Sequence, residues 1–276
     1  MSKTWFITGA SSGLGREMTS QLLSRGDRVI ATVRREDALA DLQRQHGANV
    51  LVKTLDVTDT ERVRTVLQEA FSQAERIDII VSNAGYGLFG AAEELADDQI
   101  EHQIATNLTG SIQLIRAALP HLRRQGGGRV VQVSSEGGQI AYPNFSLYHA
   151  TKWGIEGFIE SVAQEVAAFG IAFLIAEPGP TATSFATSLV RSASSAIYKG
   201  TPADEVRAAI DSGAFVIKGD AERTVKAIIA AADAPKPDLR LALGSTAYAS
   251  ISKALDNRRA SLEAQRHVAF SADKDD

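Results

Sequence analysis

Short apolar runs alternate with longer amphipathic stretches along the chain. Seven runs are apolar at nearly every position, as expected of parallel strands buried between two layers of helices. They cover residues 4–8, 28–33, 50–55, 78–83, 129–134, 171–176 and 239–243. Between them, apolar residues recur at helical spacing, which predicts helices over 14–24, 36–45, 59–74, 97–123, 146–168 and 221–232.

This strand–helix alternation predicts an α/β protein with a single doubly wound parallel sheet of about seven strands and helices on both faces. Residues 1–245 would form one domain, in which the Ser- and Ala-rich segment 184–219 is a long loop at the substrate site. Residues 246–276 would add a C-terminal helix, over 246–266, and a frayed polar tail.

One helix start is marked by a local motif. Thr58 lies three residues before Glu61, the spacing of a capping box.

Composition narrows the class of protein. The chain has 276 residues, of which 44% are hydrophobic and 22% charged, which is ordinary for a soluble globular protein. Its net charge of -4 gives no reason to expect nucleic acid or an anionic membrane as a partner. With no cysteine, disulfides, thiol nucleophiles and Cys-ligated metals are excluded, and no metal site is predicted. Neither a signal peptide nor a membrane-spanning run is recognised, so a cytoplasmic protein is expected.

A glycine-rich turn follows the first predicted strand. In "TGASSGLGRE", Gly9, Gly13 and Gly15 precede a helix that begins near Leu14. Glycines allow a sharp turn and bring backbone N–H groups close to a pyrophosphate at the helix N-terminus. The spacing, G-x-x-x-G-x-G, is a weak signal alone, but its place after the first strand of a βαβ unit favours a nucleotide site.

Tyr148 and Lys152 lie four residues apart on a predicted helix and therefore share one face. A positive neighbour lowers the pKa of a tyrosine, which would give a proton donor that works near neutral pH. The alternative is a core tyrosine beside a solvated lysine. His149 is rotated by about 100° from Tyr148 and is expected to pack or face the surface rather than act as a base.

Taken together, the motifs resemble the short-chain dehydrogenase/reductase family over residues 4 to 183. They are "TGASSGLG", "NAG" at Asn83–Gly85, Ser135 thirteen residues before Tyr148, "YHATK", and "PGPTAT" after the sixth strand. The resemblance implies a Rossmann-like fold. It also implies an oxidoreductase that transfers a hydride between a nicotinamide and the carbon of a carbonyl or secondary alcohol.

The resemblance gives four residues catalytic roles. Tyr148 would be the general acid/base, and Lys152 would lower its pKa and bind the nicotinamide ribose. Ser135 would hold the carbonyl oxygen as negative charge grows there, and Asn107 would stabilise a water chain from the lysine to solvent. From the residues alone, Ser135 could equally be a turn residue, and Asn107 a helix-ending residue near Gly110.

The end of the second strand, "ATVRRED", bears on the choice of cofactor. Val33 stands at the position where NAD-preferring members of the family that this chain resembles have Asp. Arg34 follows it, which is similar to the pattern in NADP-preferring members. A guanidinium forms bidentate hydrogen bonds with a 2′-phosphate, so NADP(H) is favoured over NAD(H). The alternative is that Arg34 and Arg35 only cap a solvated edge while Glu36 binds the ribose.

The remaining cofactor contacts are also implied by the resemblance. Asp56 and Val57 would flank the adenine, although Asp56 could instead belong to a helix start, and Asn83 could be structural, its amide joining neighbouring strands. Prolines 178 and 180 would fix a rigid turn around the nicotinamide. The full expected set is Gly9, Ser11, Ser12, Gly13, Leu14, Gly15, Arg34, Asp56, Val57, Asn83, Ala84, Gly85, Tyr148, Lys152, Pro178, Gly179, Thr181 and Thr183.

The expected substrate is a small, largely apolar ketone or alcohol. Ser135, Glu136, Tyr142 and Phe185 are the candidate contacts, with Leu88, Phe89 and Phe145 making the pocket apolar. Glu136 either contacts the substrate or faces solvent.

Partners and rival functions complete the expectations. Helix 146–168 is apolar on more than one side, which predicts a homodimer or homotetramer. A non-catalytic dinucleotide sensor stays open as an alternative, as does an epimerase of the related extended group. The intact set of Ser135, Tyr148 and Lys152 argues against the sensor, and the glycine spacing and chain size argue against the epimerase.

Overall fold

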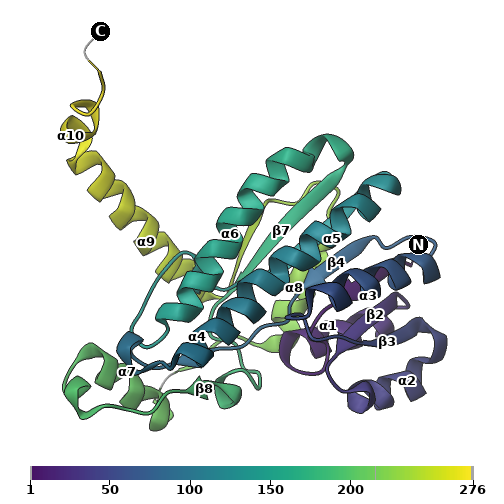
Figure 1. The fold of residues 1–276 in the computed structure, drawn as a ribbon, viewed down its shortest axis with the longest axis horizontal. Helices are drawn as coiled ribbons and strands as arrows, with labels where there is room; N and C mark the ends of the chain where they lie inside the picture. The colour runs from purple at the N-terminus through teal and green to yellow at the C-terminus, as the bar shows by residue number, and fades with distance from the viewer. Residues whose placement is uncertain (1, 215, 275–276) are drawn as a thin grey trace.

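Seven parallel strands form the central sheet in the order β3-β2-β1-β4-β6-β7-β9. Figure 1 shows this sheet with helices packed against it. The computed structural model describes residues 2–214 and 216–274. Each strand coincides with an expected one, with ends that differ by at most two residues: β1 Thr4–Ile7, β2 Arg28–Val33, β3 Val50–Thr54, β4 Ile79–Ser82, β6 Gly128–Val133, β7 Ile171–Pro178 and β9 Arg240–Leu243. The predicted doubly wound sheet is therefore confirmed.

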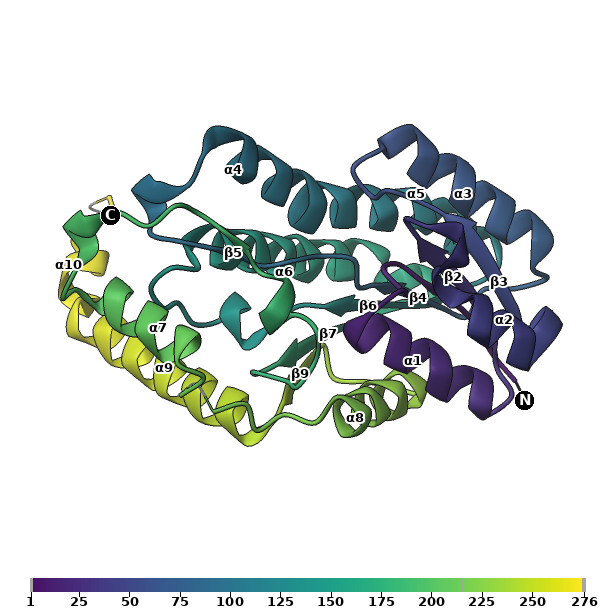
Figure 2. The ribbon, with the colours of Figure 1, turned by 90° about the horizontal axis from the view of Figure 1, so that it is seen from below.

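Helices cover both faces of this sheet, as Figure 2 shows with α3 and α5 along one side and α1 and α8 along the other. Consecutive strand residues point to opposite faces, so Trp5 lies in the core beneath α1 and α8, and Phe6 in the core beneath α3, α5 and α6. The bounds are α1 Gly13–Ser24, α2 Ala40–His46, α3 Thr60–Gln73, α4 Asp97–Ile104, α5 Gly110–Arg124, α6 Ser146–Val166 and α8 Ala221–Asp233. Within the described ranges, no helix has the length and apolar character needed to cross a membrane.

The strand order reverses at β1, which lies between β2 and β4. Open parallel sheets bind ligands in the crevice at the carboxyl ends of the strands beside such a reversal. The segments that follow β1, β4, β6 and β7 meet at this edge, and they carry most of the expected site residues.

The start of α3 differs from the prediction. Asp59 is the N-cap and accepts a hydrogen bond from the Arg62 backbone N–H at 2.9 Å, whereas the Thr58 hydroxyl donates to Asp56. The capping box of Thr58 with Glu61 is therefore wrong, because the Asp59 carboxylate takes the capping position one residue later.

The expected helix over 97–123 is interrupted by a wider turn. Residues 105–109, between α4 and α5, form a π-helical turn that contains Asn107. Such turns insert extra backbone into a helix and occur frequently at functional sites.

The segment 184–219 contains regular structure. β8 (Val190–Arg191) pairs in parallel with β5 (Leu88–Phe89), and α7 spans Pro202–Asp211. Segment 184–219 is therefore attached, through this strand pairing, to residues 85–90, which follow β4.

The C-terminal residues form α9 (Ser245–Ala264) and α10 (Arg266–Phe270), which project from the sheet (Figure 1). A helix over the expected residues is confirmed, and its buried residues are Ala247 and Ile251. The expectation of a frayed tail falls partly on residues 275–276, which lie outside the described residues.

Candidate active site

The glycine loop connects the end of β1 to the start of α1. Gly9 and Gly13 have φ angles of +67° and +53°, a region that favours glycine. α1 begins at Gly13 without an acidic residue in its first turn, so that turn contributes no carboxylate to offset the partial positive charge of the helix N-terminus. Ser11 and Ser12 are exposed in the loop, and Leu14 packs partly against the core. This end of the helix is suited to an anionic group.

Asn83 ties the glycine loop to the end of β4. Its side-chain amide donates to the carbonyl oxygens of Thr8 at 2.9 Å and Gly9 at 3.1 Å. The Thr8 hydroxyl in turn accepts from the backbone N–H groups of Asn83 and Ala84. The structural interpretation of Asn83 is thus confirmed, since its amide joins the segments that follow two neighbouring strands.

Gly15 is packed so closely that the loop depends on its missing side chain. A Cβ there would lie 2.4 Å from both Asn83 Nδ2 and the Gly9 oxygen. We expect Gly15→Ala to lower the free energy of unfolding by about 1–3 kcal/mol and to weaken binding of the expected nicotinamide dinucleotide, because the loop must shift. Thermal unfolding with and without this dinucleotide measures both effects. Gly157→Ala is the matched control, since a Cβ at that helical glycine would meet nothing within 4 Å, and equal losses in the two variants would contradict the prediction.

The end of β2 carries an exposed cation. Val33 is buried and Arg34 is exposed, and in the part of the chain that the structure describes no carboxylate lies within 4.0 Å of the Arg34 guanidinium. The Thr58 backbone N–H lowers the pKa of the Asp56 carboxyl, and the charge of Arg34 lowers it further. Asp56 therefore belongs to the turn before α3 and also lies near Arg34.

The segment "PGPTAT" lies across from the glycine loop. A Cβ built on Gly13 would lie 3.9 Å from the Thr183 Cβ, which is van der Waals contact, so these two positions lie close together and face each other. Pro178 ends β7, Gly179 packs against Ala247 of α9, and the Thr181 hydroxyl donates to the Gly179 oxygen at 2.8 Å. The N-terminus of α1 and the exposed Arg34 are together suited to the phosphate groups of a dinucleotide.

Tyr148 and Lys152, on α6, and Ser135, just after β6, are buried together at the carboxyl end of the sheet. Lys152 Nζ lies 5.5 Å from the centre of the Tyr148 ring and donates to the Val133 oxygen at 3.0 Å. The Ser135 hydroxyl accepts from the Gly137 N–H at 3.0 Å, which orients it at the turn. Three of the four sequence-predicted catalytic residues are thus brought together.

The pKa of Tyr148 is raised in the structure, whereas the sequence predicts that Lys152 lowers it. Burial raises the pKa of Tyr148 to about 12, and the Ser135 hydroxyl only partly offsets this. Burial also lowers the pKa of Lys152 to about 8, against the attraction of Glu156. Desolvation is thus the largest cause of the raised pKa of Tyr148, and the Lys152 ammonium is directed at the Val133 oxygen rather than at the phenol.

Asn107 is buried in the π-helical turn and bonds the segment after "NAG". Its amide donates to the Tyr86 oxygen at 2.8 Å, and its side-chain oxygen accepts from the Tyr86 N–H at 3.1 Å. A Cβ on Gly85 would lie 3.2 Å from that oxygen. Asn107 therefore does not end a helix, and the alternative that made it a cap is wrong.

His149 is buried and uses both ring nitrogens. Nε2 accepts from the Tyr142 N–H at 3.1 Å, so Nδ1 carries the proton and donates to the Gly137 oxygen at 2.9 Å. Burial lowers the pKa of His149 and keeps it neutral. The expectation that it packs rather than acts as a base agrees with this geometry.

Aromatic side chains cover Tyr148. The Phe185 ring lies 5.7 Å from the Tyr148 ring, and Phe145 lies edge-on to Tyr148, Tyr142 and Phe89. Phe145 and Phe185 therefore place apolar surface against the Tyr148 ring, and Phe89 and Tyr142 extend that surface through Phe145.

Glu136 is also buried, 4% exposed, and its carboxylate accepts from the Ser250 hydroxyl of α9 at 2.6 Å. Burial raises the pKa of this carboxyl. The alternative in which Glu136 faces solvent is wrong, and contact with the substrate stays a prediction.

Four polar residues near α6 were not identified from the sequence. Ser134, Glu156, Glu177 and Arg240 form a hydrogen-bonded group beside Lys152. The residue that could have pointed to this group is Glu156, because it is a glutamate four residues after Lys152 on a helix face that is otherwise buried.

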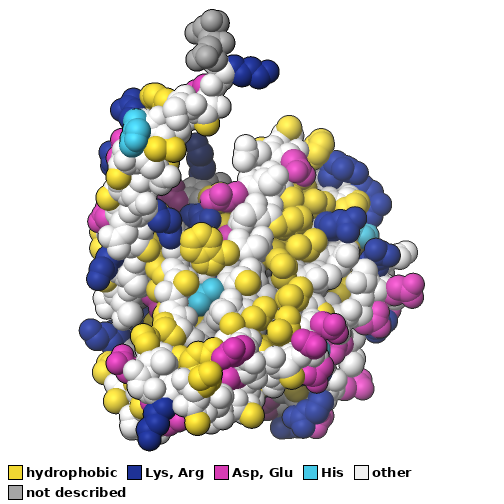
Figure 3. Space-filling view, turned by 60° about the vertical axis from the view of Figure 1, so that its left-hand side comes forward, with side chains coloured by type: hydrophobic (Ala, Val, Ile, Leu, Met, Phe, Trp, Pro, Cys, Tyr) yellow, Lys and Arg dark blue, Asp and Glu magenta, His cyan; other side chains and the backbone are white. Residues whose placement is uncertain are grey.

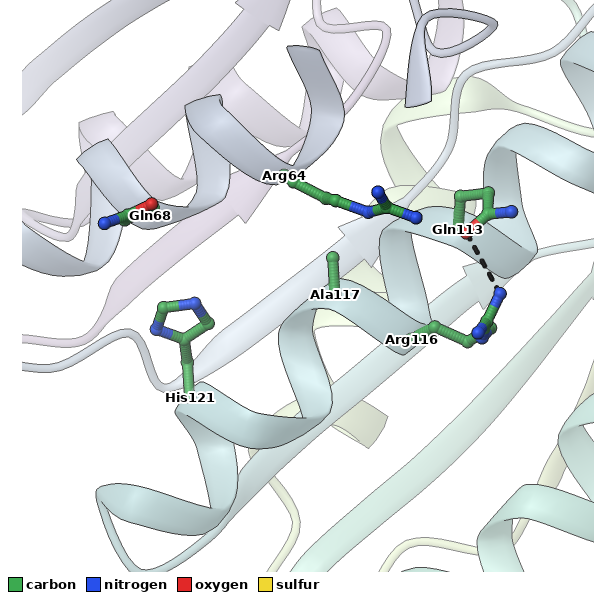
Figure 4. Close-up of a pocket in the computed structure, with 6 residues that line it drawn as sticks. All are labelled: Arg64, Gln68, Gln113, Arg116, Ala117 and His121. Carbon is green, nitrogen blue, oxygen red and sulfur yellow. Dashed lines mark hydrogen bonds between the residues drawn. The ribbon is translucent and has the colours of Figure 1, made fainter. Parts of the chain in front are cut away.

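A hollow on the outer surface between α3 and α5 contains none of the expected site residues (Figure 4). It is lined by Arg64, Gln68, Gln113, Arg116, Ala117 and His121. Among the described residues, no cluster of three or more His, Asp or Glu could hold a metal ion.

The chain is similar to known proteins over the residues that carry these motifs. The family model described as short chain dehydrogenase matches residues 3–194. Oxidoreductase BOA17 of Botryotinia fuckeliana (strain B05.10) is 35% identical over 277 residues, which cover 99% of this chain and 100% of that protein. The crystal structure of a short-chain dehydrogenase from Streptomyces avermitilis has a TM-score of 0.91 and 37% identity, over 99% of this chain and 98% of that one. A closed form of serine dehydrogenase complexed with NADP+ has a TM-score of 0.73 and 26% identity, over 87% and 94%.

Proposed function

Since the chain belongs to the short-chain dehydrogenase/reductase family and is an NAD(P)-dependent oxidoreductase, we propose that it is an NADP(H)-dependent carbonyl reductase or alcohol dehydrogenase for small, largely apolar substrates. The observation that carries the proposal is the burial of Tyr148 with Ser135 and Lys152 beneath an aromatic cover, at the sheet edge that holds the glycine loop.

The cofactor would be held by residues from four segments. The N-terminus of α1 would bind the pyrophosphate, Arg34 the 2′-phosphate, and the segments at Asn83–Gly85 and Pro178–Thr183 the nicotinamide half. When bound, the cofactor supplies or accepts the hydride, so the protein must position the substrate and move one proton.

Tyr148 would donate that proton to the carbonyl oxygen in the direction of reduction. With a pKa of about 12 it is protonated at neutral pH, which suits a general acid. Lys152, with a pKa of about 8, is mainly an ammonium at that pH and would stabilise the phenolate left behind. Ser135 would donate a hydrogen bond to the same substrate oxygen. Asn107 would hold the water chain that returns the proton from solvent.

The preference for NADP(H) rests on Arg34. It is exposed at the end of β2, next to the buried Val33, and a relative at 26% identity is described with NADP+ bound. We expect Arg34→Asp to reduce the ratio of NADPH affinity to NADH affinity by roughly 10–100-fold, because a charged hydrogen bond to phosphate is replaced by repulsion. Dissociation constants measured by quenching of protein fluorescence give the ratio.

Arg35→Asp is the matched control for this change. It alters the same net charge one residue along the chain, and Arg35 is also exposed. An unchanged ratio in Arg34→Asp, or an equal change in Arg35→Asp, would assign the preference to other residues.

The substrate would be apolar because of the side chains over Tyr148. Phe89, Phe145 and Phe185 leave little polar surface near the phenol, and Leu189 packs beside Gly87. Glu136, Tyr142 and Ser135 would supply the polar contacts on the substrate side.

Turnover with a panel of apolar ketones and aldehydes tests the function. Loss of nicotinamide absorbance with NADPH, faster than with NADH, is the expected result. Tight NADPH binding without turnover of any compound would instead favour the dinucleotide sensor.

A homodimer or homotetramer is part of the same proposal. Ile104, Trp153 and Phe169 are large apolar side chains that are 37%, 44% and 43% exposed, and Figure 3 shows hydrophobic side chains gathered on the face beside the C-terminal helices. Association of two or more chains would remove exposed apolar side chains of this kind from water. Sedimentation is expected to show a species at least twice the chain mass of 29.4 kDa.

A further inference from the structure

A buried group of charged residues lies beside α6, next to the catalytic residues. Glu156 and Glu177 have side chains that are 2% and 1% exposed, and Arg240 of β9 bonds both of them. The distance from Arg240 to Glu156 is 2.6 Å. Buried carboxylates are rarely found unless they are paired, and the Arg240 guanidinium is the cation that pairs with both Glu156 and Glu177.

The group is connected to the turn that carries Ser135. The Ser134 hydroxyl donates to Glu156, and the Ser134 backbone N–H donates to the Ala176 oxygen at 2.8 Å. Gly138, at the end of the same turn, lies against the carboxylate, because a Cβ there would be 1.7 Å from Glu156 Oε1. Movement of the Glu156 carboxylate would therefore displace both ends of the turn.

Glu156 also acts on Lys152. The two residues are four apart on α6 and lie on the same face of the helix. Burial disfavours the ammonium of Lys152, and the attraction of Glu156 is the force that opposes this.

The other groups near Lys152 do not replace that attraction. Tyr148 is a neutral phenol and His149 a neutral imidazole, and the Glu136 carboxyl is bonded to Ser250 of α9. Glu177 of β7 is bonded to Arg240. Arg240 is therefore shared by the buried Glu156 and Glu177, and it also bonds the half-exposed Glu160 at 2.9 Å.

We propose that Glu156 is a positioning residue that, through Ser134, fixes the turn carrying Ser135 and favours the ammonium form of Lys152, while Arg240 holds the Glu156 carboxylate in place. The proposal rests on the proposed function, because its effect on catalysis is exerted through Lys152 and Ser135.

The first test is the pH profile of kcat/KM for carbonyl reduction. In the natural protein we expect activity to fall as pH rises past the pKa of Lys152, about 8. Glu156→Gln removes the attraction that favours the ammonium, so this alkaline limb is expected to move to lower pH by about one unit. Glu156→Asp retains the charge, so its alkaline limb is expected to lie close to that of the natural protein.

Two further variants separate charge from position. Ser134→Ala removes the hydrogen bond to the turn but keeps the carboxylate, so kcat is expected to fall several-fold, about 3–10-fold, with the alkaline limb unmoved. Glu160→Gln is the matched control, since Glu160 is 50% exposed and bonds the same Arg240 at 2.9 Å without contacting Ser134. Its profile is expected to stay that of the natural protein.

A direct measurement does not depend on turnover. In protein labelled with 15N-lysine, the Nζ resonance of Lys152, assigned by its loss in Lys152→Met, reports the titration of the ammonium. The midpoint is expected to lie lower in Glu156→Gln than in Glu160→Gln.

The outcomes are distinguishable. If the natural protein reduces no substrate, the proposed function fails while the resonance still tests the action of Glu156 on Lys152. If it turns over but Glu156→Gln and Glu160→Gln share one pH profile and one midpoint, the role assigned to Glu156 is wrong.

Discussion

Replacing Tyr148 by phenylalanine is expected to lower kcat/KM for carbonyl reduction by roughly 10²–10⁴-fold, because the substrate oxygen loses its proton donor. The phenylalanine ring keeps the edge-on contacts with Phe145 and the contact with Phe185. The fold and the affinity for NADPH are therefore expected to change little. Steady-state kinetics and NADPH titration of the same preparation measure the two quantities separately.

The control for this variant is Tyr248→Phe. Tyr248 lies on α9 and is 71% exposed, so the loss of its hydroxyl should leave kcat/KM unchanged. If Tyr148→Phe retained more than a tenth of the activity, another group would have to donate the proton. His149 is a poor candidate for that role, since both of its nitrogens are bonded to the backbone.

Replacing Arg240 by methionine is expected to have the largest effect on stability. It leaves Glu156 and Glu177 buried without their cation, and breaking a buried ion pair by removing one partner costs about 3–5 kcal/mol. For a chain of this size that corresponds to a fall in Tm of roughly 6–20 °C. Thermal unfolding followed by circular dichroism measures it, provided that the transition is reversible.

The pH dependence of the stability lost in Arg240→Met tests whether the broken ion pairs are the cause. Burial raises the pKa of Glu177 above its usual value, followed by the repulsion of Glu156, and Arg240 opposes both. A group whose pKa is raised on folding stabilises the folded state at low pH, and that stability is lost as pH rises through the raised pKa. The defect is therefore expected to shrink as pH falls, because a neutral carboxyl needs no cation.

Arg259→Met is the matched control for stability. Arg259 is exposed on α9, and its removal should change the free energy of unfolding by less than about 0.5 kcal/mol. A similar loss in both variants, or a loss in Arg240→Met that does not depend on pH, would contradict the ion-pair explanation.

The sheet was predictable because its strands are buried on both faces. Runs such as "RVIATV" at 28–33 are apolar at nearly every position, and such runs have few alternatives to a strand in a parallel sheet. The start of α3 was predicted less well. Thr58 and Asp59 are both good N-caps, and the choice between them depends on the bond that Thr58 makes to Asp56.

The site was predictable where its chemistry is local in the sequence. Tyr148 and Lys152 are one helical turn apart, and Gly9, Gly13 and Gly15 follow one strand. These relations are fixed by secondary structure alone.

The site was not predictable where it depends on packing between distant segments. Glu156, Glu177 and Arg240 come from a helix and two strands, and Arg240 is 84 residues from Glu156. The pKa of Tyr148 likewise depends on its burial beneath the aromatic cover, including Phe185 from another segment. Spacing along the chain carries no information on such contacts.

The projecting C-terminal helix has a practical use for these experiments. Arg258 still reaches the Gln139 oxygen and the Trp153 ring, whereas Leu262, Val268 and Phe270 beyond it are exposed. A helix advances by about 1.5 Å per residue, so a biotin or fluorophore attached near Phe270 would stand well clear of the crevice. The protein could therefore be immobilised on a sensor surface through this end for cofactor-binding measurements.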